Sequence, residues 1–181
     1  AFYEKFPKVV KRLVKEGHYV GSHSYGHLLY STWEDKDKML VTKDEFKADM
    51  LKSYKLMRKF GITKQQAPYF IPPYEHYNKT VSSWAKELGL QVINYTPGTA
   101  SNGDYTTPDM KNYYSSDEIM RRIKALEEKE GLNGHFLMIH FGTSDLRTDK
   151  FYNRIPELVE YLQAKGYEFV GVEDALGLKV K

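Results

Sequence analysis

The sequence predicts an α/β fold in which parallel strands alternate with helices. Short apolar segments rich in β-branched and aromatic residues are separated along the chain by amphipathic segments with helical spacing. This alternation is typical of parallel strands joined by helical crossovers. The chain has 181 residues, enough for one domain with a substantial core, and no linker divides it. We therefore expect residues 1–181 to form a single domain.

Capping residues and apolar stripes predict the helices. Thr42 with Glu45, and Ser115 with Glu118, have the spacing of capping boxes, and Asn78 is placed to cap a third helix. The longest stripe places Phe46, Met50, Tyr54 and Met57 on one helix face. We expect helices at 2–16, 42–60, 78–88, 115–130 and 152–165, and a short terminal helix within 173–177.

Five segments are predicted to be strands: 18–24, 67–71, 90–94, 135–141 and 167–172. The run "HFLMIHF" (135–141) is apolar enough for a strand buried on both faces. Five strands could form an open sheet or part of a closed barrel. A closed barrel needs about eight strands and about 250 residues, and this chain begins with a helix that no strand precedes. We therefore expect that an N-terminal βα portion of the fold is missing from this chain.

Composition excludes several classes of protein. No apolar run approaches the roughly 20 residues of a membrane span. The formal net charge is +3, with Lys and Arg interleaved among Asp and Glu, which does not favour nucleic-acid binding. The absence of cysteine excludes disulfides, thiolate metal sites and cysteine nucleophiles. The opening "AFYEKFPKVVKRLVKEG" is amphipathic and charged, so no signal peptide is visible in this chain.

Chemically distinctive residues follow the ends of several predicted strands, where parallel βα proteins place their sites. His23 and His27 follow the first strand, at the i, i+4 spacing that aims two imidazoles at one ion from a helical turn. Two such nitrogens with a carboxylate and water form a common catalytic metal set. The alternative is a pair of surface histidines in a loop.

Two further strand ends carry candidate catalytic groups. His140 ends the apolar run "LMIH" and could act as a general acid or base, or else be a hydrogen-bonded core histidine. Pro72 and Pro73 in "IPPY" hold an extended turn that leaves the amide of Tyr74 to point outward. Such an amide could stabilise an oxyanion beside a metal; alternatively, the prolines only end a strand.

Four segments together resemble the motifs of one family. They are "EGHYVGSHSYGH" (16–27), "IPPY" (71–74), "LMIH" (137–140) and "ELVEYLQAKGYEFVGVEDAL" (157–176). The first resembles the motif His-Ser/Thr-x-x-x-His with its usual lead-in, the second Arg-x-Pro-Tyr and the third Leu-x-x-His. In order and spacing they resemble the polysaccharide deacetylases of carbohydrate esterase family 4, the NodB-homology domain, over essentially the whole chain.

The resemblance implies a distorted (β/α) barrel, incomplete here at the N-terminus, and a hydrolase that removes acetyl groups from a polysaccharide or oligosaccharide. His23 and His27 would be ligands of a divalent metal, expected to be zinc. The amide of Tyr74 would join the metal in an oxyanion hole. His140 would protonate the leaving amine or alcohol.

The resemblance also implies residues that touch the substrate. Leu137 would line the pocket for the acetyl methyl group, and Pro73 and Tyr74 would lie against the substrate. Acetylated xylan, chitin and peptidoglycan all remain open as substrates, as does the choice between N- and O-deacetylation. The full-length protein is expected to be bacterial and secreted or periplasmic.

The chain departs from the family pattern at three places. The family's Thr-Phe-Asp-Asp motif, which supplies the third metal ligand and the catalytic base, is absent. Ile71 replaces the arginine that orients the base. The family's fourth motif is not visible, so the carboxylate that supports His140 would be one of Asp104, Asp145 and Asp149.

These departures leave two alternatives to a catalytic deacetylase. One is a non-catalytic, carbohydrate-binding relative that has lost the catalytic carboxylates. The other is an unrelated βα metal hydrolase.

Overall fold

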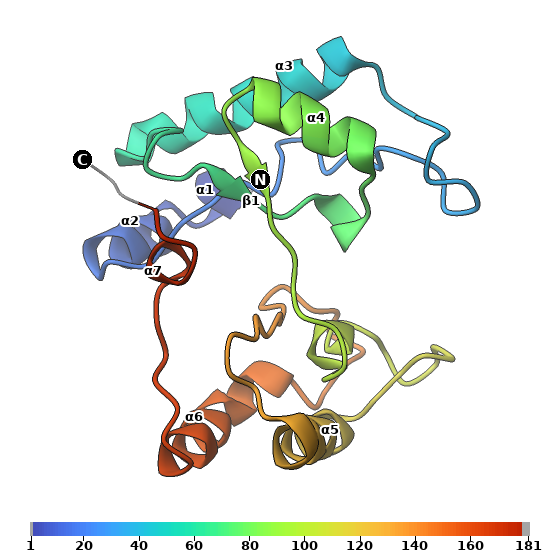
Figure 1. Cartoon of the computed structure of the whole chain (residues 1–181), viewed down its shortest axis with the longest axis vertical. Helices are drawn as coiled ribbons and strands as arrows, with labels where there is room; N and C mark the ends of the chain where they lie inside the picture. Colours follow the sequence, from blue (N-terminus) through green and yellow to red (C-terminus); the bar gives the residue numbers. More distant parts are fainter. Residues whose placement is uncertain (1, 179–181) are drawn as a thin grey trace. The chain divides into compact units, whose positions relative to one another are not determined.

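The computed structural model describes residues 2–178, which form two compact units (Figure 1). The first unit comprises residues 2–94 and 171–178, and the second comprises Tyr95–Val170. The first contains the elements α1 (Phe2–Lys5), α2 (Pro7–Lys15), α3 (Lys43–Met57), η1 (Arg58–Phe60), β1 (Tyr69–Phe70), η2 (Pro73–Glu75), α4 (Lys79–Glu87), β2 (Gln91–Val92) and α7 (Val172–Ala175). The second contains η3 (Ser101–Gly103), α5 (Ser116–Glu130), η4 (Phe151–Arg154) and α6 (Ile155–Ala164). The prediction of a single domain stays a prediction.

The first unit contains a βα crossover of the predicted kind. β1 and β2 pair in parallel, with Tyr69 opposite Gln91, and α4 connects them. Ser22 makes a parallel bridge to Phe70, so part of the segment predicted as strand 18–24 does lie beside β1. Within residues 2–178 these two short strands form the one regular sheet. The closed barrel that the resemblance implies therefore remains a proposal.

Two of the predicted strands are wrong. Residues 135–140 form no strand and are half-buried rather than buried on both faces, and Phe141 is 74% exposed. Their backbone makes separate bonds, with Thr96 through Phe136 and with Asp104 through the His140 amide, rather than the regular ladder of a sheet. Residues 167–172 run without strand pairing into α7, with Phe169 and Val170 exposed. An apolar or alternating pattern becomes a strand only where a partner supplies the ladder.

The predicted helix at 2–16 is interrupted at Phe6, which separates α1 from α2. Pro7 has no amide to donate, and its ring pushes the preceding residue out of the helical region. Phe6 accordingly adopts φ −127° and ψ 52°. The proline that breaks one helix thus begins the next, since it occupies the first turn of α2.

The predicted caps of the longer helices are largely confirmed. Thr42 and Glu45 form both bonds of a capping box at the start of α3, and Asn78 caps α4 through the amide of Val81 at 2.9 Å. Ser115 accepts a bond from the Glu118 amide, but the Glu118 carboxylate binds Arg121 and Arg122 rather than closing a box. Two nearby guanidinium groups compete successfully with the backbone for that carboxylate.

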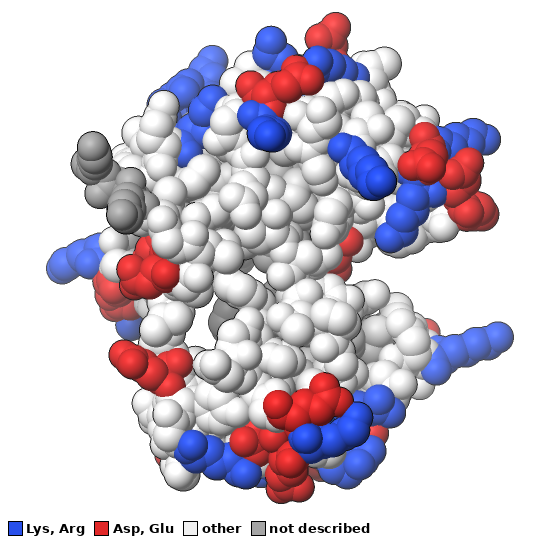
Figure 2. Space-filling view, in the orientation of Figure 1, with Lys and Arg blue, Asp and Glu red and all other residues white. Residues whose placement is uncertain are grey.

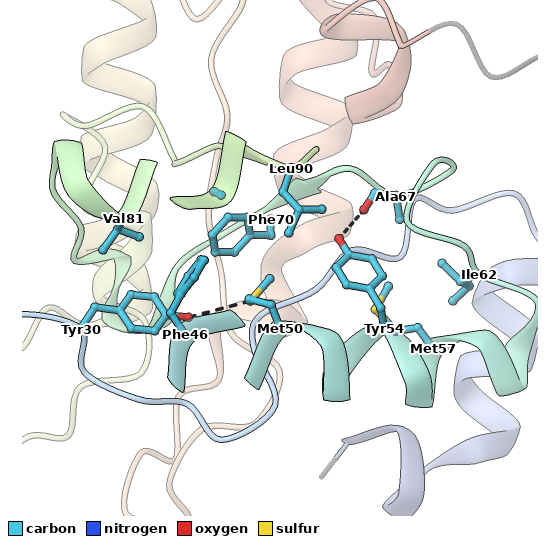
Figure 3. Close-up of a cluster of buried hydrophobic side chains, with 11 residues drawn as sticks. Tyr30, Phe46, Met50, Tyr54, Met57, Ile62, Ala67, Phe70, Val81 and Leu90 are labelled. Carbon is cyan, nitrogen blue, oxygen red and sulfur yellow. Dashed lines mark hydrogen bonds between the residues drawn. The ribbon is translucent and has the colours of Figure 1, made fainter. Parts of the chain in front are cut away.

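The predicted stripe of α3 forms the centre of the first core (Figure 3). Its four members are all at most 2% exposed. They pack against Phe70 of β1 and against Val81 and Ala85 of α4, a helix that lies beside α3 in Figure 1. The hydroxyl of Tyr54 donates to the carbonyl of Ala67 at 2.6 Å, which satisfies the polar end of a buried ring (Figure 3).

The second unit has its own core between α5 and α6. Its buried members are Ile119, Met120, Ile123, Leu132, Phe151, Leu158 and Leu162.

On the face drawn in Figure 2, basic and acidic side chains are interspersed, as the sequence predicted. Within residues 2–178, no helix combines the length and the apolar composition that crossing a membrane requires.

Candidate functional site

The histidine pair lies in a tight loop rather than on a helical turn. Ser24 and His27 have φ values of 64° and 53°, so the i, i+4 argument for convergence does not apply to this backbone. The rings nevertheless approach each other, with centroids of His23 and His27 5.0 Å apart at 66°. The loop itself brings the two imidazoles together.

Asp49 of α3 holds this loop in place. Its carboxylate accepts hydrogen bonds from the amides of Tyr25 at 2.9 Å and Gly26 at 2.7 Å. A Cβ atom at position 26 would lie 2.9 Å from the same carboxylate, so glycine permits this close approach. The sequence analysis did not single out Asp49, because a residue of a distant helix carries no local sign of this contact.

A backbone contact determines which nitrogen of His23 carries a proton. Nδ1 lies 2.8 Å from the carbonyl oxygen of Ile71. A carbonyl can only accept, so Nδ1 must donate and the lone pair of the neutral ring is on Nε2. Metal-binding histidines are commonly oriented in this way by a carbonyl. Ile71 stands where the family pattern has an arginine, and it orients the His23 ring through its backbone carbonyl.

The segment 71–75 presents a strained turn to the pair. Tyr74 and Glu75 have φ values of 60° and 54°, a conformation that costs non-glycine residues roughly 1–3 kcal/mol each. The Tyr74 ring packs edge-on against His27, with the ring centroids 4.5 Å apart, and Pro73 of the turn is buried. The amide of Tyr74 has no hydrogen-bond acceptor within the described residues. Strain at two consecutive residues is typical of functional turns.

The donor set at the pair fits part of a metal site. Two neutral imidazoles supply two of the nitrogen ligands that zinc prefers. Residues 2–178 contain no group of three His, Cys, Asp or Glu side chains that could hold an ion. The described residues therefore offer half of a coordination set.

His140 in the second unit is paired with one carboxylate. Its Nδ1 lies 2.7 Å from Oδ1 of Asp104, and its backbone amide donates to Oδ2 at 2.8 Å. The Asp104 side chain is 1% exposed and the His140 side chain 29% exposed. Of the three carboxylates that the sequence left open, Asp104 is the partner: Asp149 bonds to Ser116 and Tyr113, and Asp145 is exposed.

The surroundings of His140 are both apolar and aromatic. Leu137 is half-buried and packs against the second core, while the ring of Tyr105 lies edge-on to His140 at 5.1 Å. Because an acceptor fixes Nδ1 as the donor, the neutral ring carries its lone pair on Nε2, and the protonated ring can donate a proton from Nε2. This is the arrangement of an oriented general acid–base histidine.

The family model for polysaccharide deacetylases matches residues 2–93, just over half of the chain. The chain belongs to the polysaccharide deacetylase family. Membership rules out the alternative of an unrelated βα metal hydrolase.

Relatives of this deacetylase-family chain are bacterial. It is 30% identical over 97 residues to a peptidoglycan-N-acetylglucosamine deacetylase of Bacillus cereus, covering 53% of this chain and 31% of that protein. A second B. cereus protein of the same name is 24% identical over 176 residues, covering 97% of this chain and 71% of that protein. The chain thus spans about a third of the first relative and less than three quarters of the second.

A solved structure supports the fold of this deacetylase-family chain. The crystal structure of a peptidoglycan N-acetylglucosamine deacetylase superposes with a TM-score of 0.70 at 20% identity, covering 96% of this chain and 70% of that one. At that identity the likeness concerns the fold. It shows that the few short strands belong to a deacetylase-type arrangement.

Arg147 is a residue whose importance the sequence analysis missed. Its side chain is fully buried, which is rare for arginine unless the group is paired. It donates to the carbonyl oxygens of Thr106 (2.8 Å), Tyr114 (3.0 Å) and Asp149 (3.2 Å) and to the hydroxyl of Ser116 (3.3 Å). These bonds fasten the loop that follows Asp104 to the start of α5. "DLRTDK" gave no local sign of a buried guanidinium.

Proposed function

We propose that this chain is a metal-dependent hydrolase that removes acetyl groups from a polysaccharide. Family membership supports the reaction class. The observation that carries the proposal is the pairing of His140 with the buried carboxylate of Asp104, because it is the arrangement that proton transfer to a leaving group requires.

His140 acts as the general acid in this proposal. In the hydrolysis, the oxygen of water bonds to the acetyl carbon, the proton that this water loses passes to the surrounding solvent, and the bond from that carbon to the sugar nitrogen or oxygen breaks. The departing atom takes a proton from Nε2 of His140, while Asp104 holds Nδ1–H and stabilises the imidazolium before it transfers its proton. Acetate and the free amine or alcohol are the products.

His23 and His27 are proposed to hold the metal, with zinc the expected ion. A bound divalent ion would polarise the acetyl carbonyl and make water a better nucleophile at neutral pH. The amide of Tyr74 donates to the oxyanion that forms as the carbonyl is attacked. The contact of His23 with the Ile71 carbonyl supports this role, since it leaves the lone pair on Nε2.

Three residues are proposed to contact the substrate. Leu137 lines the space for the acetyl methyl group, and Pro73 and Tyr74 lie against the sugar. Tyr74 is 45% exposed, so its ring has surface to offer. Pro73 is buried and would act mainly by shaping the turn.

The relatives suggest where to look for the substrate. Those described above are named for peptidoglycan N-acetylglucosamine. We therefore propose N-deacetylation of N-acetylglucosamine residues as the first activity to test, with acetylated xylan and chitin oligomers beside it. A protein acting on such a polymer would work outside the cytoplasm.

Two observations favour a second function, a carbohydrate-binding relative without catalysis. Ile71 occupies the position of the arginine that orients the base in the family pattern. No third metal-binding side chain joins His23 and His27 within the described residues. Such a protein would keep the sugar-binding surface and lose the reaction.

Acetate release distinguishes the two functions. Peptidoglycan, N-acetylglucosamine oligomers and acetylated xylan would be incubated with the chain, with zinc and with a chelator. Zinc-dependent acetate release from one substrate supports the deacetylase. Binding of a substrate without acetate release supports the non-catalytic relative, and neither binding nor release refutes both.

A further inference from the structure

Trp33 is an exposed tryptophan that the proposed chemistry does not use. It lies in the irregular segment 28–41, and 57% of its surface is exposed. The chain has two tryptophans, and the other, Trp84, packs against the first core. Tryptophan is highly buried on average because of its large apolar area. An indole left in water therefore needs an explanation.

Hydrogen bonds between residues 32 and 38 close the backbone around Trp33 into a turn. The amide of Thr32 donates to the carbonyl of Lys38 at 3.0 Å, and the hydroxyl of Thr32 donates to the carbonyl of Asp35 at 2.8 Å. Ser31 and Met39 form an antiparallel bridge behind this turn. The segment is irregular in sequence pattern but well bonded in structure.

The buried ring of His76 packs against the indole of Trp33. Its ring lies 4.5 Å from the Trp33 ring, measured between centroids, and it is 5% exposed. Its Nε2 lies 3.0 Å from the carbonyl of Thr32, which can only accept, so Nε2 donates. His76 directly follows the strained turn at 73–75, and its hydrogen bond to Thr32 therefore ties that turn to the backbone next to Trp33. The indole is held in place before any ligand arrives, which lowers the entropic cost of binding.

A continuous row of rings joins Trp33 to the histidine pair. The Trp33 ring lies 5.9 Å from the Tyr74 ring at 80°, and Tyr74 lies 4.5 Å from His27. His27 in turn is 5.0 Å from His23. All of these residues belong to the first unit. The exposed indole is thus one ring beyond the residues proposed to hold the metal and the oxyanion.

We propose that Trp33 is a sugar-binding platform that stacks on a pyranose ring adjacent to the sugar being deacetylated. This inference rests on the proposed function and adds the position of a neighbouring sugar subsite. The C–H groups of a pyranose face carry partial positive charge and pack well on the electron-rich face of an indole. The hydroxyl groups around the sugar's edge need polar partners, and Glu34 and Asp35 are exposed next to the platform.

The neighbourhood of Trp33 fits a sugar better than a protein. Residues 34–38 are all charged and all exposed. Centres of protein interfaces are depleted in charged residues, and stable interfaces bury about 800 Å² on each partner. A single indole surrounded by charges offers no apolar centre of that kind. A sugar ring, with one apolar face and a polar rim, matches it.

Trp33 fluorescence provides a direct test that does not depend on activity. In the Trp84→Phe variant, Trp33 is the one tryptophan, and N-acetylglucosamine tetramer would be titrated into it. We expect a shift in the emission spectrum with the tetramer and little change with the monosaccharide, because the platform contacts a neighbouring sugar. By calorimetry, Trp33→Ala should bind the tetramer about tenfold more weakly, a loss of about 1.4 kcal/mol of stacking. Trp33→Tyr should retain most of the affinity.

Leu51→Ala is the matched control, since Leu51 is an exposed apolar residue of the same unit. It should bind the tetramer as the unchanged chain does. Tetramer binding that is unaffected by Trp33→Ala and silent in the fluorescence would overturn the platform while leaving the proposed function intact. If the unchanged chain neither binds the tetramer nor releases acetate from any of the three substrates, the proposed function and the platform are refuted together.

Discussion

Asp104 accepts two hydrogen bonds from one residue, His140. Oδ1 takes the imidazole Nδ1 at 2.7 Å and Oδ2 takes the backbone amide at 2.8 Å. Both carboxylate oxygens are thus committed to His140, and the aspartate is almost fully buried. The pair fixes the ring's orientation and its tautomer together.

Asp104→Asn should lower turnover by roughly 10²–10⁴-fold with little change in KM, because an amide cannot hold the imidazolium as a carboxylate does. Steady-state kinetics on whichever of the tested substrates releases acetate measures this. Nitrogen chemical shifts of His140 should show Nδ1 as the protonated site in the unchanged chain and a mixture in the variant. Asp145→Asn, in an exposed neighbouring loop, is the control. Turnover of Asp104→Asn within about twofold of the unchanged chain would refute the pairing's role.

The histidine pair should bind zinc through both rings. We expect His23→Ala and His27→Ala each to weaken zinc binding by more than about tenfold, since even outer partners of metal ligands contribute about 10–100-fold. Competition with a chromophoric chelator measures the affinity. His18→Ala, which removes an exposed histidine of the same unit, should leave it unchanged. Equal zinc binding by all four chains would remove the pair from the metal site.

Arg147 should be among the most important residues for the stability of the second unit. Arg147→Met removes four hydrogen bonds and leaves the carbonyls of Thr106 and Tyr114 without their donor, so we expect a loss of about 3–5 kcal/mol in the free energy of unfolding. Urea unfolding followed by circular dichroism measures it. Arg154→Met, which removes a partly exposed arginine paired with Asp117 and Glu157, should cost less than about 1 kcal/mol. Similar losses in both variants would argue against a special role for Arg147.

Glu118 should contribute stability that acid removes. Hydrogen bonds from Arg121 and Arg122 lower the pKa of Glu118 from 4.5 to about 2. The unfolded chain therefore takes up this proton at a higher pH than the folded chain, so the contribution is complete above pH 4.5 and is lost as the pH falls towards 2.

Thermal unfolding of the unchanged chain and of Glu118→Gln measures this contribution. The difference between their Tm values should be present at pH 6 and shrink between pH 4.5 and 2. Glu160→Gln, at an exposed site of α6, serves as the comparison. A Tm difference for Glu118→Gln that stays constant over that range would contradict the assignment.

Local signals in the sequence predicted the helices well. The box at Thr42, the cap at Asn78 and the stripe of α3 depend on residues within one or two turns of each other, so the sequence contains what determines them. Strands depend on partners elsewhere in the chain. The run 135–141 has the composition of a buried strand, yet it lacks a ladder and leaves Phe141 exposed.

In the candidate site, too, local motifs predicted some residues, whereas residues that depend on distant partners could not be predicted. The motifs located His23, His27, Tyr74 and His140, but the sequence could not choose among three aspartates for the partner of His140, because that choice depends on a contact spanning 36 positions. Asp49, Arg147 and the support of Trp33 by His76 are likewise long-range contacts. A residue's type suggests what it could do, whereas its partners become known only from the fold.

The central claim is that this chain deacetylates a polysaccharide with His140 as its proton donor. The most direct measurement is acetate release from N-acetylglucosamine oligomers in the presence of zinc, by the unchanged chain and by His140→Ala, with His135→Ala as the control. We predict acetate release by the unchanged chain and by His135→Ala, and a loss of at least about 10²-fold in His140→Ala. No release by the unchanged chain, or equal release by all three, would contradict the claim.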